Sequence, residues 1–146
     1  MPENAEITIR RLGAGDASFA RFAIEELFGG SAETEHLASF LEDRSHYLLV
    51  AESAGFVNGI LLAYRLARIK DEGFKIFLYE IEVDSRRRRK GIGSGLISGI
   101  LSIGKAEGAR SVFGMTGPSY QGAKEFYLAT GAEIVGEEEI LFEFKL

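Results

Sequence analysis

The segment Arg88-Arg89-Lys90-Gly91-Ile92-Gly93-Ser94-Gly95-Leu96-Ile97 joins two stretches of different periodicity. A strand is predicted before it, over Phe74 to Val83, and apolar residues recur at helical spacing after it, over Ile92 to Glu107. Glycines let a ligand approach the backbone closely, and the unpaired amides at a helix start attract an anion. This turn therefore predicts a pyrophosphate site formed by Arg88, Arg89, Lys90, Gly91, Gly93 and Ser94.

Other interpretations of the same turn are less consistent with its glycines. A Rossmann fingerprint needs G-x-G-x-x-G after the first strand, whereas here the glycines are 91, 93 and 95 and the turn follows the fourth predicted strand. The Walker pattern G-x-x-x-x-G-K-[ST] is absent. The charge run alone favours a solvated basic loop, but its glycines and its place between strand and helix favour an anion site.

Composition predicts a single soluble domain over residues 1–146. Hydrophobic residues make up 46% and charged residues 27% of the chain, as in ordinary globular proteins. There is no cysteine and there are only two histidines, His36 and His46, so neither a disulfide nor a metal site is expected, and we assign the histidines no role. The net charge of -5 argues against nucleic-acid binding and suits a cationic substrate.

No membrane or targeting segment is expected. The uncharged stretch from Gly91 to Gly104 is shorter than the roughly 18 apolar residues that a spanning helix requires. The acidic N-terminus lacks the basic start and apolar core of a signal peptide. We therefore expect a cytoplasmic protein, either alone or as a homodimer.

The order of predicted elements indicates an α+β fold with one mixed sheet covered by helices. Gly95, Gly99 and Gly104 weaken the long central helix, which suggests that it packs closely against its neighbours. The predicted strands are Ile7–Leu12, His46–Glu52, Phe56–Leu66, Phe74–Val83, Ser111–Met115, Glu133–Val135 and Ile140–Phe144. The predicted helices are Ala17–Leu27, a second around Leu37 to Leu41, Ile92–Glu107 and Gln121–Ala129.

The chain resembles the Gcn5-related N-acetyltransferases (GNAT family). Their signature R/Q-x-x-G-x-G/A is matched by Arg88, Gly91 and Gly93, and a second pattern, A-x-x-F/L-Y with a later Gly, is matched by residues 123–127 and Gly131. The resemblance implies about seven strands in a mixed, mostly antiparallel sheet that is splayed between strands 4 and 5 and flanked by four helices. It also implies acetyl-coenzyme A as cosubstrate, without a metal.

The same resemblance assigns roles to individual residues. The pyrophosphate of the coenzyme is expected on the glycine turn, and the pantetheine arm along the backbones of Ile81 and Val83. Tyr127 occupies the position of the general acid for the leaving thiolate. Taken alone, a Phe-Tyr pair on a helix more often belongs to the core. Tyr120 replaces an Asn that is customary in the family.

Within the family, the aminoglycoside 3-N-acetyltransferases of the first type are the most similar. Their patterns V-x-G-x-L-x-A-Y and I-Y-x-Y-D-L-x-V resemble residues 57–64 and 76–83. Glu80 stands where they carry an Asp that is thought to act as base. The likeness therefore implies that Glu80 is the base and that the acceptor is the 3-amino group of an aminoglycoside, which would connect the chain with antibiotic resistance.

Acetyl transfer to an amine needs a proton acceptor, a polarised carbonyl and a stabilised thiolate. Glu80 and Glu82 are two residues apart on a predicted strand, so both should project from one face while Tyr79, Ile81 and Val83 take the other. The pair could equally be ordinary solvent-facing residues.

The two helices after the first strand add further acidic residues that suit a cationic substrate, although any acidic protein shows such faces: Glu25, Glu26, Glu33, Glu35, Glu42 and Asp43. We expect Glu80, Glu82 and Glu26 to contact the acceptor.

The sequence therefore predicts transfer of acetyl from acetyl-coenzyme A to a small cationic amine by direct attack, with Glu80 as base and Tyr127 as acid. Other acceptors stay open, namely a polyamine, an amino acid or a protein N-terminus. A non-catalytic acyl-coenzyme A sensor with the same fold is a further alternative. No nucleic-acid or membrane partner is expected.

Overall fold

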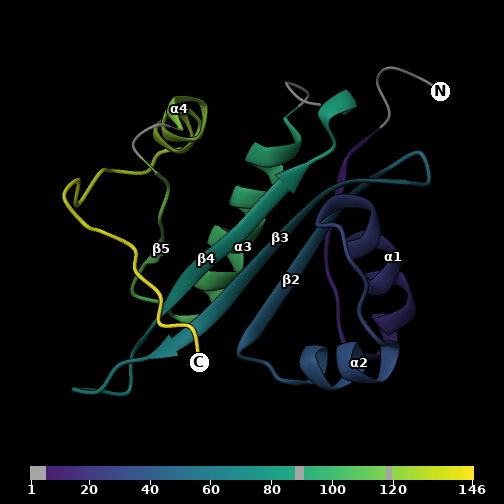
Figure 1. Cartoon of the computed structure of the whole chain (residues 1–146), viewed down its shortest axis with the longest axis horizontal. Helices are drawn as coiled ribbons and strands as arrows, with labels where there is room; N and C mark the ends of the chain where they lie inside the picture. Colours follow the sequence, from purple (N-terminus) through teal and green to yellow (C-terminus); the bar gives the residue numbers. More distant parts are fainter. Residues whose placement is uncertain (1–5, 88–90, 118–119) are drawn as a thin grey trace. The chain divides into compact units, whose positions relative to one another are not determined.

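The computed structural model describes residues 6–87, 91–117 and 120–146. Contacts divide the chain into two units, one ending at Gly114 and the other beginning at Met115. The first unit contains a sheet of five strands in the described part of the chain, in the order β1-β2-β3-β4-β5. Figure 1 shows its long central strands. The strands pair antiparallel from β1 to β4, and β5 joins β4 in parallel.

The predicted order of helices and strands is confirmed for most of the chain. The strands of the first unit are β1 (Thr8–Arg11), β2 (His46–Ser53), β3 (Phe56–Ala67), β4 (Phe74–Val83) and β5 (Val112–Gly114). Its helices are α1 (Ala17–Leu27), α2 (Thr34–Glu42) and α3 (Ile92–Glu107), with short 3-10 turns η1 (Ala14–Asp16) and η2 (Ser85–Arg87). The second unit contains α4 (Gln121–Ala129).

The predicted mixed α+β fold is confirmed, but the described sheet has five strands instead of about seven. The segments 133–135 and 140–144, predicted as strands, form none. Their apolar residues are largely exposed, with Val135 at 94% and Ile140 at 84%. A strand requires a hydrogen-bonded neighbour, which the alternation of apolar residues along one segment cannot supply.

Helices cover both faces of the sheet in the first unit. On one face, Leu48, Val50 and Ile60 form a buried cluster with apolar residues of α1 and α2. On the other face lies α3, whose Ile92, Leu96 and Ile100 are buried. Adjacent strand residues point to opposite faces, so Gly59 and Leu61 belong to the face of α3.

Glycines bring α3 close to the sheet, as predicted. A Cβ atom on Gly99 would lie 2.9 Å from Ile9 Cγ2 and 3.2 Å from Leu49 Cδ2, and one on Gly95 would lie 3.3 Å from Ile9 Cδ1. On the strand side, a Cβ atom on Gly59 would lie 2.7 Å from Ile92 Cγ2. Because these glycines have no side chains, α3 can lie this close to the strands beneath it.

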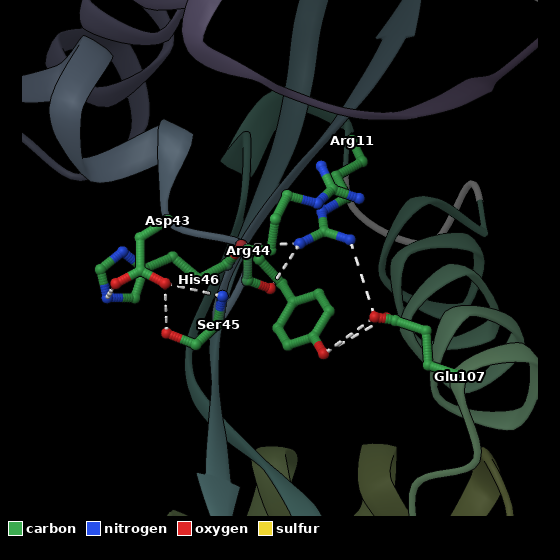
Figure 2. Close-up of polar contacts among 7 residues, drawn as sticks. Arg11, Asp43, Arg44, Ser45, His46 and Glu107 are labelled. Carbon is green, nitrogen blue, oxygen red and sulfur yellow. Dashed lines mark hydrogen bonds and ion pairs between the residues drawn. The ribbon is translucent and has the colours of Figure 1, made fainter.

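A polar cluster attaches the C-terminal end of α3 to β1 and β2 (Figure 2). The Arg11 guanidinium donates hydrogen bonds to the carbonyls of Arg44 (3.1 Å) and His46 (2.9 Å), and its Nη1 lies 4.0 Å from Glu107 Oε1. The guanidinium carbon is 4.3 Å from the centre of the Tyr47 ring. The Tyr47 hydroxyl donates to Glu107 Oε1 at 3.2 Å. Burial lowers the pKa of Arg11 and raises that of Tyr47.

In the second unit, α4 ends as the sequence predicts, at Thr130 and Gly131. Gly131 has φ 100°, a left-handed conformation that glycine adopts readily. The amide of Ala132 donates to the Tyr127 carbonyl at 3.0 Å and the amide of Gly131 to the Leu128 carbonyl at 3.1 Å, which together form a Schellman motif. Thr130 Oγ1 also donates to the Tyr127 carbonyl, at 2.8 Å. These bonds fix the last turn of α4, which carries Tyr127.

Replacing Gly99 by Ala tests the close packing of α3. In an open helix the change stabilises by about 0.5–1 kcal/mol, but here the new methyl meets Ile9 and Leu49. We expect the free energy of unfolding, measured by urea denaturation, to fall by about 1 kcal/mol. The matched control is Gly122→Ala in α4, where no atom lies within 4 Å of the new Cβ; its stability should be unchanged or higher. A gain of stability in Gly99→Ala would show that a methyl group fits between α3 and the strands, and would contradict the close packing.

Candidate active site

One edge of β4 is open beyond Leu78 within the first unit. On one side β4 pairs with β3 along its whole length, from Phe74 to Val83. On the other side its pairing with β5 covers only residues 76–78. The last five residues of β4 therefore have a strand on one side only in this unit, as a sheet splayed between these strands requires.

Two hydrogen bonds show in which direction the backbone amides and carbonyls of β4 point. The amide of Ile76 donates to the Ser111 carbonyl at 3.0 Å, next to β5. Its partner on β3 is Arg65, whose amide donates in the opposite direction, to the Ser45 carbonyl at 2.8 Å. In this pair, the backbone amides and carbonyls of both residues therefore point away from each other.

The same orientation recurs at the end of β4. Gly59 and Leu61 are separated from Arg65 by even numbers of residues on β3, so their polar groups also point away from β4. Their partners on β4 are Val83 and Ile81. The amides and carbonyls of Ile81 and Val83 are consequently directed to the open edge, where an extended amide-containing ligand can pair with them.

The N-terminus of α3 lies in the connection that follows this edge. Gly91 caps the helix with φ 79°, and the first helical bond runs from the Gly95 amide to the Gly91 carbonyl at 2.9 Å. The amides of Ile92, Gly93 and Ser94 thus have no acceptor inside the helix. Such amides, together with the helix dipole, favour an anion at this end of a helix. The predicted contributors Arg88, Arg89 and Lys90 lie outside the described residues.

The neighbouring acid Asp84 is already engaged in an ion pair. Its Oδ2 accepts a hydrogen bond from Arg86 Nη2 at 2.9 Å. The hydrogen bond with Asp84 raises the pKa of Arg86, and the charge of Glu26 contributes in the same direction. Glu26 therefore belongs to the surroundings of η2, at the end of β4.

Glu80 and Glu82 share one face of the sheet, as the sequence predicts. Glu80 pairs with Leu62 and Glu82 with Ile60, and both partners belong to the apolar cluster beneath α1 and α2. Glu80 is exposed and Glu82 is partly buried. The two carboxylates are thus presented on the face that carries α1 and α2, beside the open edge of β4.

The predicted position of Tyr79 on the opposite face is wrong. Leu62 pairs with Glu80 but the next residue, Ala63, pairs with Leu78, so Tyr79 is an extra residue, a β-bulge. Its ring contacts those of Tyr64 and Phe77, with centroids 5.7 and 5.8 Å apart. Bulges break the alternation of a strand and redirect a side chain, and here Tyr79 joins the face of Glu80.

Two of the six acidic residues expected to suit a cationic substrate make local hydrogen bonds. Glu25 accepts a hydrogen bond from Arg21 Nε at 3.0 Å and another from Ser31 Oγ at 3.0 Å, which lower its pKa. Asp43 accepts from the hydroxyl and amide of Ser45. These two carboxylates serve local structure.

Tyr127 belongs to the second unit and is half-buried. Burial raises the pKa of its hydroxyl, which therefore holds its proton at neutral pH. Its ring lies 5.3 Å from that of Phe126.

Over residues 6–87, 91–117 and 120–146, no helix combines the length and apolar character needed to cross a bilayer. In the same ranges, no cluster of three or more potential ligand side chains is arranged to hold a metal ion.

Residues 18–132 match the acetyltransferase (GNAT) family, and this stretch includes the open edge of β4, the turn before α3 and all of α4. The chain belongs to the GNAT family. The resemblance carried by the glycine turn is thereby confirmed. Both features of the first unit fit coenzyme A, since the edge of β4 offers amide partners to pantetheine and the start of α3 offers amides to a pyrophosphate.

Several known proteins are similar to this GNAT chain. The rat (Rattus norvegicus) protein N-acetyltransferase 8 is 30% identical over 99 residues, which are 68% of this chain and 45% of that protein. The chain thus spans less than half the length of this relative. An aminoglycoside acetyltransferase, meta-AAC0020, from an uncultured soil metagenomic sample, solved in complex with sisomicin, is 25% identical with a TM-score of 0.86 and 96% coverage of both chains.

A second similar structure shows the shared fold alone. The aminoglycoside N-acetyltransferase AAC(6')-Iy, solved in complex with CoA, is 20% identical with a TM-score of 0.78, and the match covers 99% of this chain and 98% of that one.

Replacing Gly91 by Val tests the anion-binding end of α3. The side chain would enter the space in front of the helix, where no atom of the described residues lies within 4 Å of a Cβ, and φ 79° is unfavourable for valine. We expect the affinity for coenzyme A, measured by calorimetry, to fall about tenfold or more, which is a loss of ~1.4 kcal/mol or more.

The control for this variant lies at the other end of the same helix. Gly108 has φ 84° and equally open surroundings, so Gly108→Val imposes similar backbone strain without touching the N-terminus. Its coenzyme affinity should stay at the level of the unmodified protein. An equal loss in both variants would mean that strain, and not access to the amides, explains the effect.

Proposed function

We propose that this protein transfers an acetyl group from acetyl-coenzyme A to a primary amine of a small cationic acceptor, specifically the 3-amino group of an aminoglycoside. The main supporting observation is the end of β4, where Glu80 and Glu82 share one face and the backbone of Ile81 and Val83 opens to the adjacent edge. A proton acceptor and main-chain partners for an extended thioester arm thus come from the same four residues, 80–83.

The coenzyme would be held by main-chain groups of the first unit. The amides and carbonyls of Ile81 and Val83 would pair with its pantetheine arm, and the free amides of Gly93 and Ser94 with its pyrophosphate, next to Arg88, Arg89 and Lys90 of the same turn. Acetyl-coenzyme A supplies an activated acetyl thioester. Gly91 would contribute by its lack of a side chain, since no atom of the described residues lies within 4 Å of a Cβ placed there.

The proton transfers are assigned to two side chains. Glu80 would take a proton from the acceptor ammonium, directly or through a water molecule, so that the amine becomes nucleophilic. Glu82, and Glu26 at the end of α1, would hold neighbouring ammonium groups of the acceptor. A backbone amide between Ile81 and Val83 would polarise the reacting carbonyl.

Tyr127 would then protonate the departing sulfur. Burial raises the pKa of Tyr127 above its ordinary value, so the hydroxyl is protonated at the pH at which the amine reacts. The direct reaction requires no covalent intermediate on the protein.

The aminoglycoside assignment is supported by two independent resemblances. Residues 57–64 and 76–83 follow the pattern of aminoglycoside 3-N-acetyltransferases, and the soil acetyltransferase solved with sisomicin has a similar fold at 25% identity. A polycation also suits a chain with net charge -5. Such an activity would make the protein an antibiotic-resistance enzyme acting in the cytoplasm.

Parallel assays with several acceptors test the proposal directly. Release of free thiol from acetyl-coenzyme A is followed with an aminoglycoside, spermidine and a peptide with a free N-terminus. We expect release with the aminoglycoside, and product analysis should place the acetyl group on the 3-amino nitrogen. Release only with spermidine or only with the peptide would identify that compound as the acceptor and would reject the aminoglycoside. Coenzyme binding without release from any acceptor would instead indicate an acyl-coenzyme A sensor.

Glu80→Gln tests the proposed base. The substitution keeps the size of the side chain but removes the proton acceptor, so kcat should fall by about 100-fold or more. Coenzyme affinity should change less than about twofold, because the pyrophosphate is expected at α3 and not at Glu80.

Two further variants make this result specific. Glu82→Gln distinguishes the roles of the paired carboxylates, since a larger loss of kcat there would assign the base to Glu82. Glu72→Gln removes an exposed carboxylate in the β3–β4 connection and should leave kcat unchanged. An unaltered kcat in Glu80→Gln would reject Glu80 as the base.

Tyr127→Phe tests the proposed acid and its pH dependence. Burial raises the pKa of Tyr127 above its ordinary value of about 10, so the hydroxyl is protonated below that pH. Ionisation of the hydroxyl can therefore reduce kcat only at higher pH. The variant lacks the proton at every pH, so kcat should fall by about 100-fold across the neutral range. The melting temperature should change little, since the ring is retained. If kcat of the variant equals that of the unmodified protein at every pH, Tyr127 is not the acid.

A further inference from the structure

A row of aromatic rings crosses the sheet on the face that carries Glu80. Tyr64 of β3 meets Tyr79 of β4 edge to face, with centroids 5.7 Å apart and planes at 86°. Tyr79 meets Phe77 in the same manner, at 5.8 Å and 85°. Phe77 stacks on Phe113 of β5 at 5.1 Å. The row thus extends from β3 to β5, through the bulge of β4.

Tyr79 combines two properties that rarely occur together. Its ring makes edge-to-face contacts with two other rings, which are favourable arrangements for aromatic pairs, and yet the residue is 60% exposed. A ring that only stabilised the sheet would gain more from burial. A ring that is fixed and exposed is a preorganised binding surface, because a ligand need not immobilise it.

The surroundings of Tyr79 suit a cation. Tyr79 precedes Glu80, and both lie on the same face because the bulge adds one residue to β4. The pKa of the Tyr64 hydroxyl is raised by burial and further by the charges of Tyr79 and Glu80, so these three groups share one electrostatic environment. An aromatic face attracts an ammonium group, and a neighbouring carboxylate adds to that attraction.

The shape of the row distinguishes classes of amine. A flexible linear polyamine can place its charge near Glu80 but has no flat ring face to lay on Tyr79. An amine carried on a saturated ring can do both, because the apolar face of the ring packs on the aromatic surface while the ammonium reaches the carboxylate.

We propose that Tyr79 forms an acceptor subsite that binds the ring carrying the reactive amine, and that it selects cyclic amines over linear ones. The inference deepens the function proposed above and depends on it for the reaction, although binding at the subsite does not require turnover. Tyr64 and Phe77 act as positioning residues that fix the ring of Tyr79.

The decisive variants are Tyr79→Ala and Tyr79→Phe. For an aminoglycoside acceptor, Tyr79→Ala should raise KM about tenfold, as expected for the loss of one aromatic contact to a cation, while kcat changes much less. Tyr79→Phe retains the ring and should restore KM to within about twofold of the unmodified protein. With spermidine as acceptor, whose ammonium can contact the aromatic face but which has no ring to pack on it, Tyr79→Ala should raise KM less than with the aminoglycoside.

A matched control separates binding from packing. Ile69 is a large apolar residue outside the row and is fully exposed in the β3–β4 connection, so Ile69→Ala should leave KM unchanged. The melting temperature is measured for every variant. A purely structural Tyr79 would lower the melting temperature and kcat for all acceptors without a change of KM that is specific to cyclic amines, and this result would overturn the inference.

Calorimetry distinguishes failure of the inference from failure of the proposed function. Binding of the aminoglycoside is measured in the presence of unacetylated coenzyme A, which cannot react. If the unmodified protein binds the aminoglycoside, and Tyr79→Ala weakens binding about tenfold, the subsite stands even where no acetylation is observed. If the two proteins bind it equally, or if neither binds it, the subsite is rejected whatever the acetylation assay shows.

Discussion

The pairing of β3 with β4 determines the direction of almost every group at the candidate site. The pair is regular from Gly59 to Leu62, so Ile81 and Val83 turn their polar groups to the open edge while Glu80 and Glu82 face the side of α1 and α2. One inserted residue, Tyr79, separates this stretch from the part of β4 that pairs with β5. The insertion therefore brings a carboxylate, an aromatic ring and an unpaired backbone together over a few residues.

The sequence predicted the elements whose limits are set by local chemistry. The bounds of α1, α3 and α4 follow from apolar spacing and from the glycines that end them. The family membership inferred from Arg88, Gly91 and Gly93 is confirmed. The shared face of Glu80 and Glu82 also follows from simple alternation, since both lie on the same side of the bulge.

Features that depend on a partner segment were not predictable in the same way. Nothing in residues 76–83 indicates an extra residue, because a bulge is defined only by the register with β3, and this is why Tyr79 was placed on the wrong face. The strands expected at 133–135 and 140–144 need a neighbour that alternation does not specify. The roles of Glu80, Tyr127 and the coenzyme-binding residues stay predictions, with Arg88, Arg89 and Lys90 outside the described residues.

The glycines of α3 also couple the assembly of the sheet to the formation of the anion-binding end. A helix with glycines at 93, 95, 99 and 104 has low intrinsic helicity, and most of the stability of a helix in a protein comes from its tertiary packing. Contacts with Ile9, Leu49 and Ile76 on the strands therefore supply the order that the sequence of α3 lacks. The amides of Ile92, Gly93 and Ser94 take their positions at the start of the helix only in the folded protein, so a ligand that bound them would shift the folding equilibrium towards the native state.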